Sequence, residues 1–328
     1  MKSRTIVPIV AAIIALVAIW LILSPADNAD NSDMERVAVR LKWLHQAQFA
    51  GFYVADKKGF YEDEGLDVAL NPGGVDFPAI QMVAGGGEQF GVTGADQILI
   101  ARSKGVPIVA LAVIYRKSPM VFFSLSDERI TTPKDFEGHR VGVKYGGNEE
   151  LTYRALLRKA GVDASKIAEI PVKYDMSPLF SGDVEVWPGY AINEPIVAQE
   201  RGHSVNIIWP SDYGVYLYAD ALFATEELIR DRPDLVQRFV RATLKGWEYA
   251  VQNPSEAVDY ALTYSDNLNA PHESAMMAAS LDLLKPDARP IGTMDASVWK
   301  GMEDLLLEGG SLKSRTDIEE VYTTRFIE

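Results

Sequence analysis

The stretch RVAVRLKWLHQAQFAGFYVADKKGFYEDEGLDV, residues 36–68, indicates the fold class of the chain. Residues 36–43 alternate between apolar and polar side chains and predict a strand. Residues 48–65 predict a helix that ends at Gly65, because glycine is common just past a helix C-terminus. A second strand is predicted to begin at residue 66. This order of strand, helix and strand is typical of α/β layers.

The same alternation continues through the next hundred and fifty residues. Residues 106–116 are almost continuously apolar, as expected of a strand that is covered on both faces. A strand, a glycine turn and a helix are predicted over 139–161. Other strands are predicted over 66–74, 89–94, 119–126, 167–172, 184–190 and 204–210, and other helices over 76–87, 95–105 and 192–202. The pattern predicts α/β layers around a largely parallel sheet.

The alternation falls into two sets, followed by a helical tail. Lobe I is predicted to comprise residues 36–120, lobe II residues 121–218, and residues 219–328 are predicted to return to lobe I and add C-terminal helices. From about residue 221 the pattern changes to helices, predicted over 225–253, 254–265, 272–285 and 296–310. A chain of 328 residues is long enough for two such lobes. Ligands of these sheets bind beyond the carboxyl ends of the strands, so a cleft between the lobes is the expected site.

The N-terminus has the pattern of an export segment. Lys2 and Arg4 precede an uncharged, mostly apolar run over residues 6–23, and a polar linker, residues 27–35, follows. Residues 1–26 are predicted to be either a cleaved signal peptide or a retained membrane anchor, and the length of the run fits both. The rest of the chain is therefore expected outside the cytoplasm, in the periplasm or on the outer face of the membrane.

Composition excludes several classes of function. The formal net charge of −14 argues against nucleic acid, whose phosphates need basic surfaces. The chain has no cysteine, which excludes disulfides, thiolate metal sites and a cysteine nucleophile. The four histidines are scattered without a zinc-binding spacing, and the sequence has neither GxSxG nor a recognisable acid/base pair. We expect no catalytic residue, no metal and no cofactor.

The strand-end rule selects six loops for the binding site. They are Trp43–Phe49, Gly94–Asp96, Tyr115–Ser118, Tyr145–Asn148, Gly189–Glu194 and Asp212–Tyr216. The candidate ligand-binding residues in them are Trp43, His45, Gln46, Gly94, Asp96, Tyr115, Tyr145, Gly146, Gly147, Tyr190, Asn193 and Glu194.

Residue types in these loops suit a flat polar ring. Trp43, His45 and Gln46 interleave ring and amide groups, although Trp43 could equally be core and a lone histidine is commonly structural. Gly94 ends a strand, with Asp96 as the predicted N-cap of the next helix. The turn over 145–147 leads into a helix start that could present backbone N–H groups.

The segment GYAINEP, residues 189–195, sets an aromatic ring, an amide and a carboxylate where a strand passes into a helix. Tyr190 could stack on a ring, while Asn193 and Glu194 could bind the donors on its edge through charge-assisted hydrogen bonds. The alternative is that Asn193 caps the helix and Glu194 occupies its first turn, which favours acids without any ligand.

Three segments carry a resemblance to a known family. LKWLHQAQFAGFYVADKKGFYEDEGLDV (41–68), GVTGADQILIARSKGVPIVALA (91–112) and GYAINEPIVAQERGH (189–203) resemble the NMT1/THI5-like solute-binding proteins, over roughly residues 36–265. The resemblance implies the bilobed type 2 periplasmic-binding-protein fold and an ABC-transporter permease as partner. It also implies a small heterocyclic ligand, either a thiamine-pyrimidine precursor or a riboflavin-like compound. Trp43, Tyr190 and Glu194 match the positions that hold the ring in pyrimidine-binding relatives.

The same resemblance leaves other functions open. Related proteins bind sulfonate or nitrate, and others are ligand-sensing subunits. Eukaryotic members are pyrimidine synthases with a cysteine-rich iron motif, which a chain without cysteine cannot contain.

Overall fold

The computed structural model describes residues 34–327. Residues Arg36–Glu328 form one compact unit, and the contacts reported below lie within it. The predicted export segment, residues 1–26, lies outside the described residues, as does the linker over 27–33. Within residues 34–327, none of the helices combines the length and the apolar character needed to cross a bilayer.

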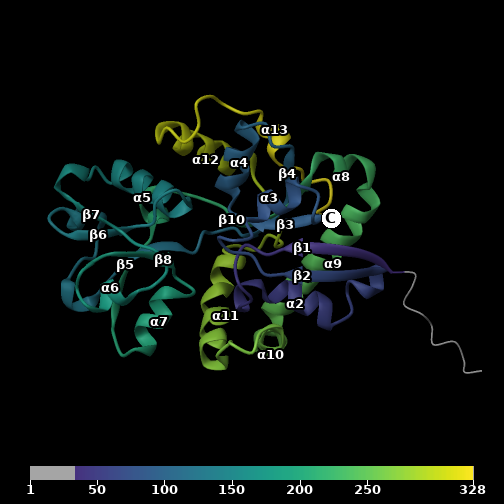
Figure 1. Ribbon diagram of the computed structural model, residues 1–328, viewed down its shortest axis with the longest axis horizontal. Coiled ribbons are helices and arrows are strands. Elements are labelled where there is room, and N and C mark those ends of the chain that lie inside the picture. Colours follow the sequence, from purple (N-terminus) through teal and green to yellow (C-terminus); the bar gives the residue numbers. More distant parts are fainter. Residues whose placement is uncertain (1–33, 328) are drawn as a thin grey trace, which may run out of the picture. The chain divides into compact units, whose positions relative to one another are not determined.

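Lobe I is built on a five-stranded sheet whose strand order is β2-β1-β3-β10-β4 (Figure 1). β1 runs parallel to β3, whereas β10 runs antiparallel to both of its neighbours. The sheet is therefore mixed, which confirms the mixed-sheet α/β lobes predicted from the family resemblance, whereas strand–helix alternation alone had indicated a largely parallel sheet. Its strands are β1 (Glu35–Arg40), β2 (Leu66–Asn71), β3 (Phe90–Thr93), β4 (Ile108–Tyr115) and β10 (Ala219–Thr225). All of β4 is buried, as its apolar run predicted.

The strand β10 contradicts the sequence prediction of helices from about residue 221. Its segment ADALFAT is buried over the first six residues and lies between β3 and β4. A short apolar run has no periodicity that separates a strand from a helix. Its hydrogen-bond partners also come from residues more than one hundred positions earlier, so local sequence carries no sign of them.

Helices cover both faces of the lobe I sheet. They are α2 (Ala50–Lys57), α3 (Ala79–Ala84), α4 (Ala95–Ser103), α8 (Glu226–Asp231), α9 (Pro233–Gln252), α10 (Pro254–Ala261), α11 (Ala270–Leu284), α12 (Ala296–Glu308) and α13 (Ile318–Val321). The predicted helix over 48–65 is shorter, because the chain turns at Gly59 with φ of 71°. The predicted helix over 225–253 is two helices, because Pro233 cannot continue α8 and instead begins α9.

The helices α2 and α9 approach closely in the core of lobe I. A Cβ atom at Gly246 would lie 2.3 Å from the Gly51 carbonyl oxygen, and one at Gly51 would overlap the Trp247 ring. Glycine at both positions is therefore needed for this packing. The contact fixes α9 against the helix that follows the first candidate loop.

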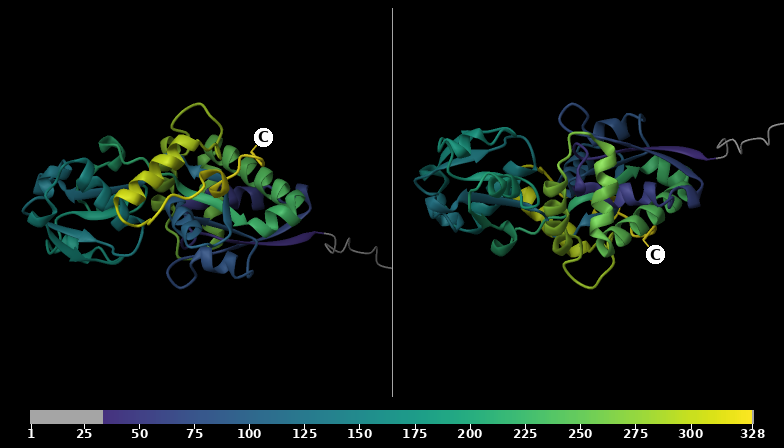
Figure 2. Two further views of the ribbon diagram at one scale, coloured as in Figure 1. Left: turned by 90° about the horizontal axis from the view of Figure 1, so that it is seen from above. Right: turned by 90° about the horizontal axis from the view of Figure 1, so that it is seen from below.

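Lobe II contains two smaller sheets. β8-β5-β9 is antiparallel and β6-β7 is parallel. The elements are β5 (Met120–Leu125), β6 (Arg140–Val143), α5 (Asn148–Lys159), β7 (Ala168–Pro171), α6 (Ser177–Phe180), β8 (Trp187–Tyr190), α7 (Glu194–Glu200) and β9 (Val205–Ile208). Figures 1 and 2 agree that these elements gather at one end of the compact unit, apart from the five-stranded sheet.

Two segments join the lobes. One runs from β4 to β5 over residues 116–119, and the other runs from β9 to β10 over residues 209–218. The second delivers the chain into the middle of the lobe I sheet. Because the chain crosses only here within residues 36–327, rotation about these segments would open or close the space between the lobes.

Candidate functional site

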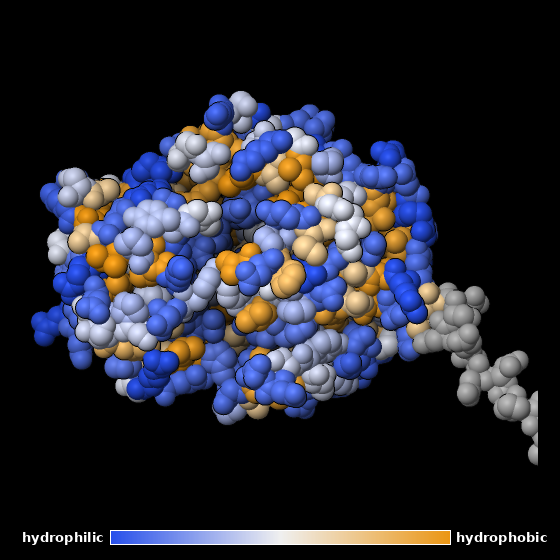
Figure 3. All heavy atoms as spheres, in the orientation of Figure 1, coloured by the Kyte–Doolittle hydropathy of each residue, from blue (hydrophilic) through white to orange (hydrophobic). Residues whose placement is uncertain are grey.

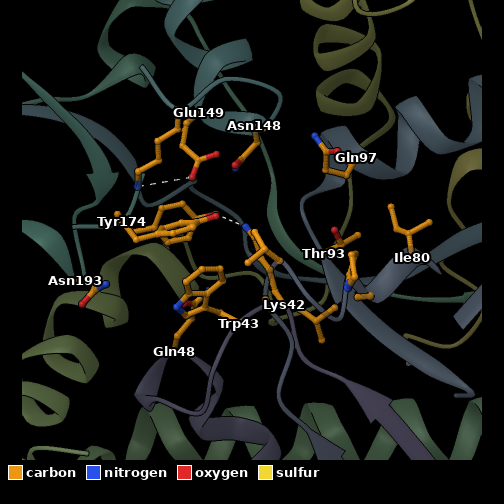
Figure 4. Close-up of a pocket in the computed structure, with 18 of the residues that line it drawn as sticks. Lys42, Trp43, Gln48, Ile80, Thr93, Gln97, Asn148, Glu149, Tyr174 and Asn193 are labelled. Atoms are coloured by element: carbon orange, nitrogen blue, oxygen red, sulfur yellow. Dashed lines mark hydrogen bonds and ion pairs between the residues drawn. The ribbon is translucent and has the colours of Figure 1, made fainter. Parts of the chain in front are cut away.

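A cavity of about 820 Å³ lies between the two lobes. Lobe I contributes the residues after β1, helix α3 and the start of α4, and lobe II contributes the ends of β6 and β8 and the loop before α6. In Figure 4, Thr93, Gln97 and Ile80 of lobe I lie across an open space from Glu149 and Tyr174 of lobe II. Figure 3 shows mostly hydrophilic residues on the outer face, with apolar residues in separated groups. The cavity is thus the candidate site for a small molecule, and its volume is in the usual range for one.

The cavity brings together half of the candidate residues from the sequence. The six that line it are Trp43, Gln46, Gly147, Tyr190, Asn193 and Glu194. The other six, which do not line it, are His45, Gly94, Asp96, Tyr115, Tyr145 and Gly146.

Asp96 lies behind the cavity wall. Gly94, not Asp96, is the N-cap of α4, so that part of the prediction was wrong. A Cβ atom at Gly94 would lie 2.4 Å from Asp96 Oδ1, which shows how closely the carboxylate folds over the turn. Burial raises the pKa of Asp96, although hydrogen bonding from Gln97 and the charge of Lys42 oppose that rise. The Gln97 amide donates to Asp96 Oδ2 at 2.7 Å, so Asp96 orients a side chain that does line the cavity.

His45 and Tyr115 belong to the core of lobe I. The His45 ring lies beside Tyr53 and Tyr264, and its Nδ1 is 3.1 Å from the Tyr53 hydroxyl. Burial lowers the pKa of His45. The fully buried Tyr115 hydroxyl lies within hydrogen-bond distance of the Gln48 carbonyl oxygen, at 3.3 Å, and of Ser280 Oγ, at 3.1 Å. Both residues support the loop that carries Trp43.

Tyr145 and Gly146 lie on the outer side of the turn before α5. The exposed Tyr145 hydroxyl donates to Glu169 at 3.0 Å. Gly146 has φ of 85°, a left-handed conformation that favours glycine, and its N–H donates to Glu150. The turn thereby places Gly147, the N-cap of α5, on the cavity wall.

Lys42 crosses the cavity from lobe I to lobe II. Its ammonium donates a hydrogen bond to the Tyr190 hydroxyl and lies 3.3 Å from Asp220 Oδ1. The other Asp220 oxygen accepts from Gln48 Nε2 at 2.5 Å. Asp220 is 1% exposed and has φ of 51°, a strained conformation that aspartate tolerates better than most residues. The network therefore begins at a buried acid on β10 and ends on a tyrosine of the other lobe.

The charges of this network keep Lys42 protonated. Burial alone lowers the pKa of Lys42, but the nearby Tyr190 and Asp220 outweigh it, so the pKa is raised above its ordinary value. Burial raises the pKa of Tyr190 to about 12, against the opposing charge of Lys42. At neutral pH the pair is an ammonium donating to a neutral phenol.

Glu194 is held in place from two sides. Its Oε2 accepts from the Tyr190 backbone N–H at 2.8 Å, and its Oε1 lies 3.3 Å from Lys144 Nζ. A Cβ atom at Gly189 would lie 2.8 Å from Glu194 Cβ, so the strand end must be glycine for this approach. Each carboxylate oxygen has a second lone pair, which leaves Glu194 able to accept a further donor from the cavity.

Asn193 does not cap α7 with its side chain, although it occupies the N-cap position. Its Oδ1 lies 3.1 Å from Nε2 of His272, which comes from α11 of lobe I. His272 Nδ1 lies 3.0 Å from Glu200 at the other end of α7. His272 therefore fastens α7 to lobe I and orients the Asn193 amide beside the cavity.

An aromatic pair also spans the cavity. The Trp43 and Tyr174 ring centroids are 4.7 Å apart, with an angle of 48° between the planes, and Figure 4 shows the two rings beside each other. Tyr174 lies in the loop between β7 and α6 and is 49% exposed. Trp43 and Lys42 are neighbours in sequence, so adjacent residues of lobe I contact two different tyrosines of lobe II.

Comparison with known proteins assigns the chain to a family. The family model described as NMT1/THI5 like matches residues 46–257. The chain belongs to the NMT1/THI5-like family.

Relatives of this NMT1/THI5-like protein are named as binding proteins for two different compounds and as a synthase. Riboflavin-binding protein RibY of Chloroflexus aurantiacus is 27% identical over 93% of this chain and 89% of its own length. The formylaminopyrimidine-binding protein of Halalkalibacterium halodurans is 29% identical over 92% of both chains. The 4-amino-5-hydroxymethyl-2-methylpyrimidine phosphate synthase of Legionella pneumophila is 24% identical over 91% of this chain and 94% of its own length.

Solved structures confirm the fold of the NMT1/THI5-like chain. The periplasmic aliphatic sulphonate binding protein SsuA of Escherichia coli superposes with a TM-score of 0.72 at 16% identity, over 90% of this chain and 99% of SsuA. The fold is the bilobed type 2 periplasmic-binding-protein fold that the sequence predicted.

Several residues in and beside the cavity escaped the sequence analysis. Lys42 lies two residues past the end of β1, and its place beside Trp43 was a signal that could have been used. Tyr174 and Asp220 had no such signal, since one lies in an irregular loop and the other in an unpredicted strand. Among residues 34–327, no group of histidine and acidic side chains has an arrangement that could hold a metal ion.

Proposed function

We propose that this protein is the extracytoplasmic solute-binding component of an ABC importer, and that it captures a small planar heterocycle in the cavity between its lobes. The ligand classes are an aminopyrimidine precursor of thiamine, such as a hydroxymethyl- or formylaminopyrimidine, and a riboflavin-like compound. Two relatives that span nearly the whole chain are named for binding such compounds, which supports both classes.

One observation carries the proposal: Trp43, Tyr190, Asn193 and Glu194 line a single cavity although they come from two lobes. The aromatic rings of Trp43 and Tyr190 can stack on the faces of a planar heterocycle. The Asn193 amide and the Glu194 carboxylate suit an edge that presents N–H donors, because such hydrogen bonds to a carboxylate are charge-assisted. Only a ligand with both features uses all four residues.

The charges in the cavity argue against the sulfonate or nitrate alternative. Lys42 is paired with the buried Asp220, and Lys144 lies 3.3 Å from Glu194 and 4.0 Å from Glu149. An anion beside Lys42 or Lys144 would have to compete with the carboxylates that already contact these two lysines. A neutral ring with donors on its edge meets no such cost.

The ligand acts by holding the lobes together. Contacts to both lobes shift the open–closed equilibrium only if they are absent in the open state. Here the walls belong to different lobes, so a ligand that bridges them favours closure. The closed surface would be the form that the permease recognises, and the export segment over residues 1–26 would place the protein in the same compartment as the permease entrance.

The experiment is a ligand panel followed by calorimetry. Unfolding temperature is measured with 4-amino-5-hydroxymethyl-2-methylpyrimidine, its formylamino relative, riboflavin, taurine and nitrate, each at several concentrations. Binding to the native state raises its stability, so a planar heterocycle should raise the unfolding temperature and the two anions should not. Stabilisation by taurine or nitrate alone would overturn the proposal.

Pyrimidine synthase activity is a second candidate, because one relative carries that name. A synthase of this kind needs a bound pyridoxal cofactor, and Lys42 is a partly buried lysine in the cavity. An ammonium whose pKa is raised is a poor nucleophile for an imine, so this lysine does not favour that chemistry. Incubation with pyridoxal phosphate, followed by mass spectrometry of small molecules, distinguishes the candidates: appearance of a pyrimidine product would favour the enzyme.

A further inference from the structure

We propose that Tyr174 is a ligand-binding residue, and that a planar aromatic ligand inserts between Tyr174 of lobe II and Trp43 of lobe I. This inference rests on the proposed function and specifies how the cavity selects its ligand. Tyr174 was absent from the sequence prediction, where the stacking ring of lobe II was Tyr190.

Tyr190 is poorly placed to move onto a ligand. Its hydroxyl accepts the hydrogen bond from Lys42, and its backbone N–H donates to Glu194. Stacking that required Tyr190 to rotate would break the contact with the buried Lys42–Asp220 pair. Tyr190 can thus form a fixed wall, but the movable ring of lobe II must be another residue.

Tyr174 has that freedom. It lies in the loop that joins β7 to α6, and 49% of the residue is exposed. Its ring contacts Trp43 on one side and lies 5.1 Å from Lys144 Nζ, an attractive but non-directional contact. Both contacts can persist or re-form while the ring shifts by a few ångströms.

Trp43, in contrast, is anchored. Its carbonyl oxygen accepts a hydrogen bond from Gly73 at 2.9 Å, and the ring packs against the lobe I core. A Cβ atom at Gly74 would lie only 3.9 Å from the indole, so the turn over 73–74 supports the ring closely. One member of the pair is therefore fixed and the other is mobile.

The distance between the rings defines the ligand class. A flat ring between two others needs about 3.5 Å on each side, or roughly 7 Å between the outer rings. The present centroid distance is 4.7 Å, so Tyr174 must withdraw by about 2–3 Å, by loop movement or lobe rotation. A planar heteroaromatic ring can stack on Trp43 with one face and on Tyr174 with the other. A tetrahedral sulfonate group has no flat faces and cannot stack on either ring.

The test uses Tyr174→Ala, Tyr174→Phe and a matched control, Tyr145→Ala. Tyr145 is also in lobe II and is 51% exposed, but it does not line the cavity. Calorimetry is performed with the panel heterocycle that most stabilises the wild type. We expect Tyr174→Ala to weaken affinity on the order of 10-fold to 100-fold, the usual range for removal of a ring that stacks on a base. Tyr174→Phe and Tyr145→Ala should stay within about twofold of the wild type, since both keep the stacking ring.

Fluorescence gives a second readout that reports on the Trp43 ring directly. Ligand-induced quenching is compared between the wild type and Trp43→Phe, and the difference isolates the Trp43 signal from the other five tryptophans. That difference should be large with Tyr174 present and reduced in Tyr174→Ala. The inference is overturned if Tyr174→Ala binds as tightly as the wild type, or if Tyr145→Ala loses as much affinity. If no planar compound binds the wild type, the proposed function itself is contradicted.

Discussion

The Lys42 ammonium donates a hydrogen bond to the Tyr190 hydroxyl, so a residue that follows β1 of lobe I is tied to the end of β8 in lobe II. The same ammonium is neutralised by Asp220, which lies on the strand that returns from lobe II. The contact thus joins the two lobes through protein side chains alone. It predicts that the empty protein already populates a partly closed arrangement.

Tyr190→Phe tests this direct link between the lobes. The substitution keeps the ring and removes the hydroxyl that accepts from Lys42. Because hydrogen bonds to charged groups contribute about 1.5–3 kcal/mol, we expect the empty variant to shift toward the open form. Small-angle scattering should show a larger radius of gyration than for the wild type. A Tyr145→Phe variant, altered outside both the cavity lining and the segments that join the lobes, should leave the radius unchanged; equal radii for all three proteins would contradict the link.

Asp220→Asn should destabilise the fold. The variant removes the negative charge from a 1% exposed position and leaves Lys42 without its buried counter-ion. Breaking one side of a buried ion pair costs about 3–5 kcal/mol, and the partly accessible Lys42 places the expected loss toward the lower end. Urea unfolding measures it, with the exposed Asp266→Asn as control. A loss no larger than that of the control would show that the pair contributes little.

Glu194→Gln should weaken binding of an aminopyrimidine more than binding of riboflavin. The amide keeps the shape but loses the charge that strengthens hydrogen bonds from the amino edge, a difference of about 1–1.5 kcal/mol, or roughly 5-fold to 13-fold in affinity. Isothermal calorimetry with both compounds tests this, and the exposed Glu128→Gln serves as control. Unchanged affinity for the aminopyrimidine would remove Glu194 from the site.

Glu256 gives the stability of the fold a defined pH dependence. Hydrogen bonds from the Tyr249 and Tyr260 hydroxyls hold the pKa of Glu256 at about 2, below its ordinary value of 4.5. Since the pKa is lower in the folded state, its stabilising contribution is complete above pH 4.5 and is lost as the pH falls toward 2. The difference in urea midpoint between the wild type and Glu256→Gln should therefore be largest near neutral pH and shrink in acid. The exposed Glu227→Gln control should show no such trend. If the difference in urea midpoint between the wild type and Glu256→Gln is the same at every pH, Glu256 is not the source of the pH dependence.

Local sequence was informative about elements whose signals are local. The apolar run of β4, the glycine turn at Gly146 and the strand-to-helix passage at 189–195 appear in the structure where the pattern placed them, whereas the helix expected to end at Gly65 ends at Lys57. Strand β10 was missed, because a short, mostly apolar segment such as ADALFAT is compatible with a strand or a helix until β3 and β4 are in place.

Some residues of the candidate site could also be predicted from local sequence, and others could not. Trp43, Tyr190 and Glu194 could be predicted because they directly follow or end strands. Asp96 and Tyr115 satisfied the same rule but point into the lobe I interior, since a strand end has two faces and sequence does not tell which one meets the cavity.

By itself the sequence determined the α/β class, the two sets of strands and helices, the acidic cysteine-free composition and the loops from which a site could be built. Only the tertiary structure decided that Lys42 pairs with Asp220, that Tyr174 contacts Trp43 and that His272 orients Asn193. These pairs are separated by 178, 131 and 79 positions in the chain, and their members come from elements that meet only in the folded tertiary structure. Periodicity and turn chemistry act over a few residues, whereas a binding cavity depends on distances across the folded chain.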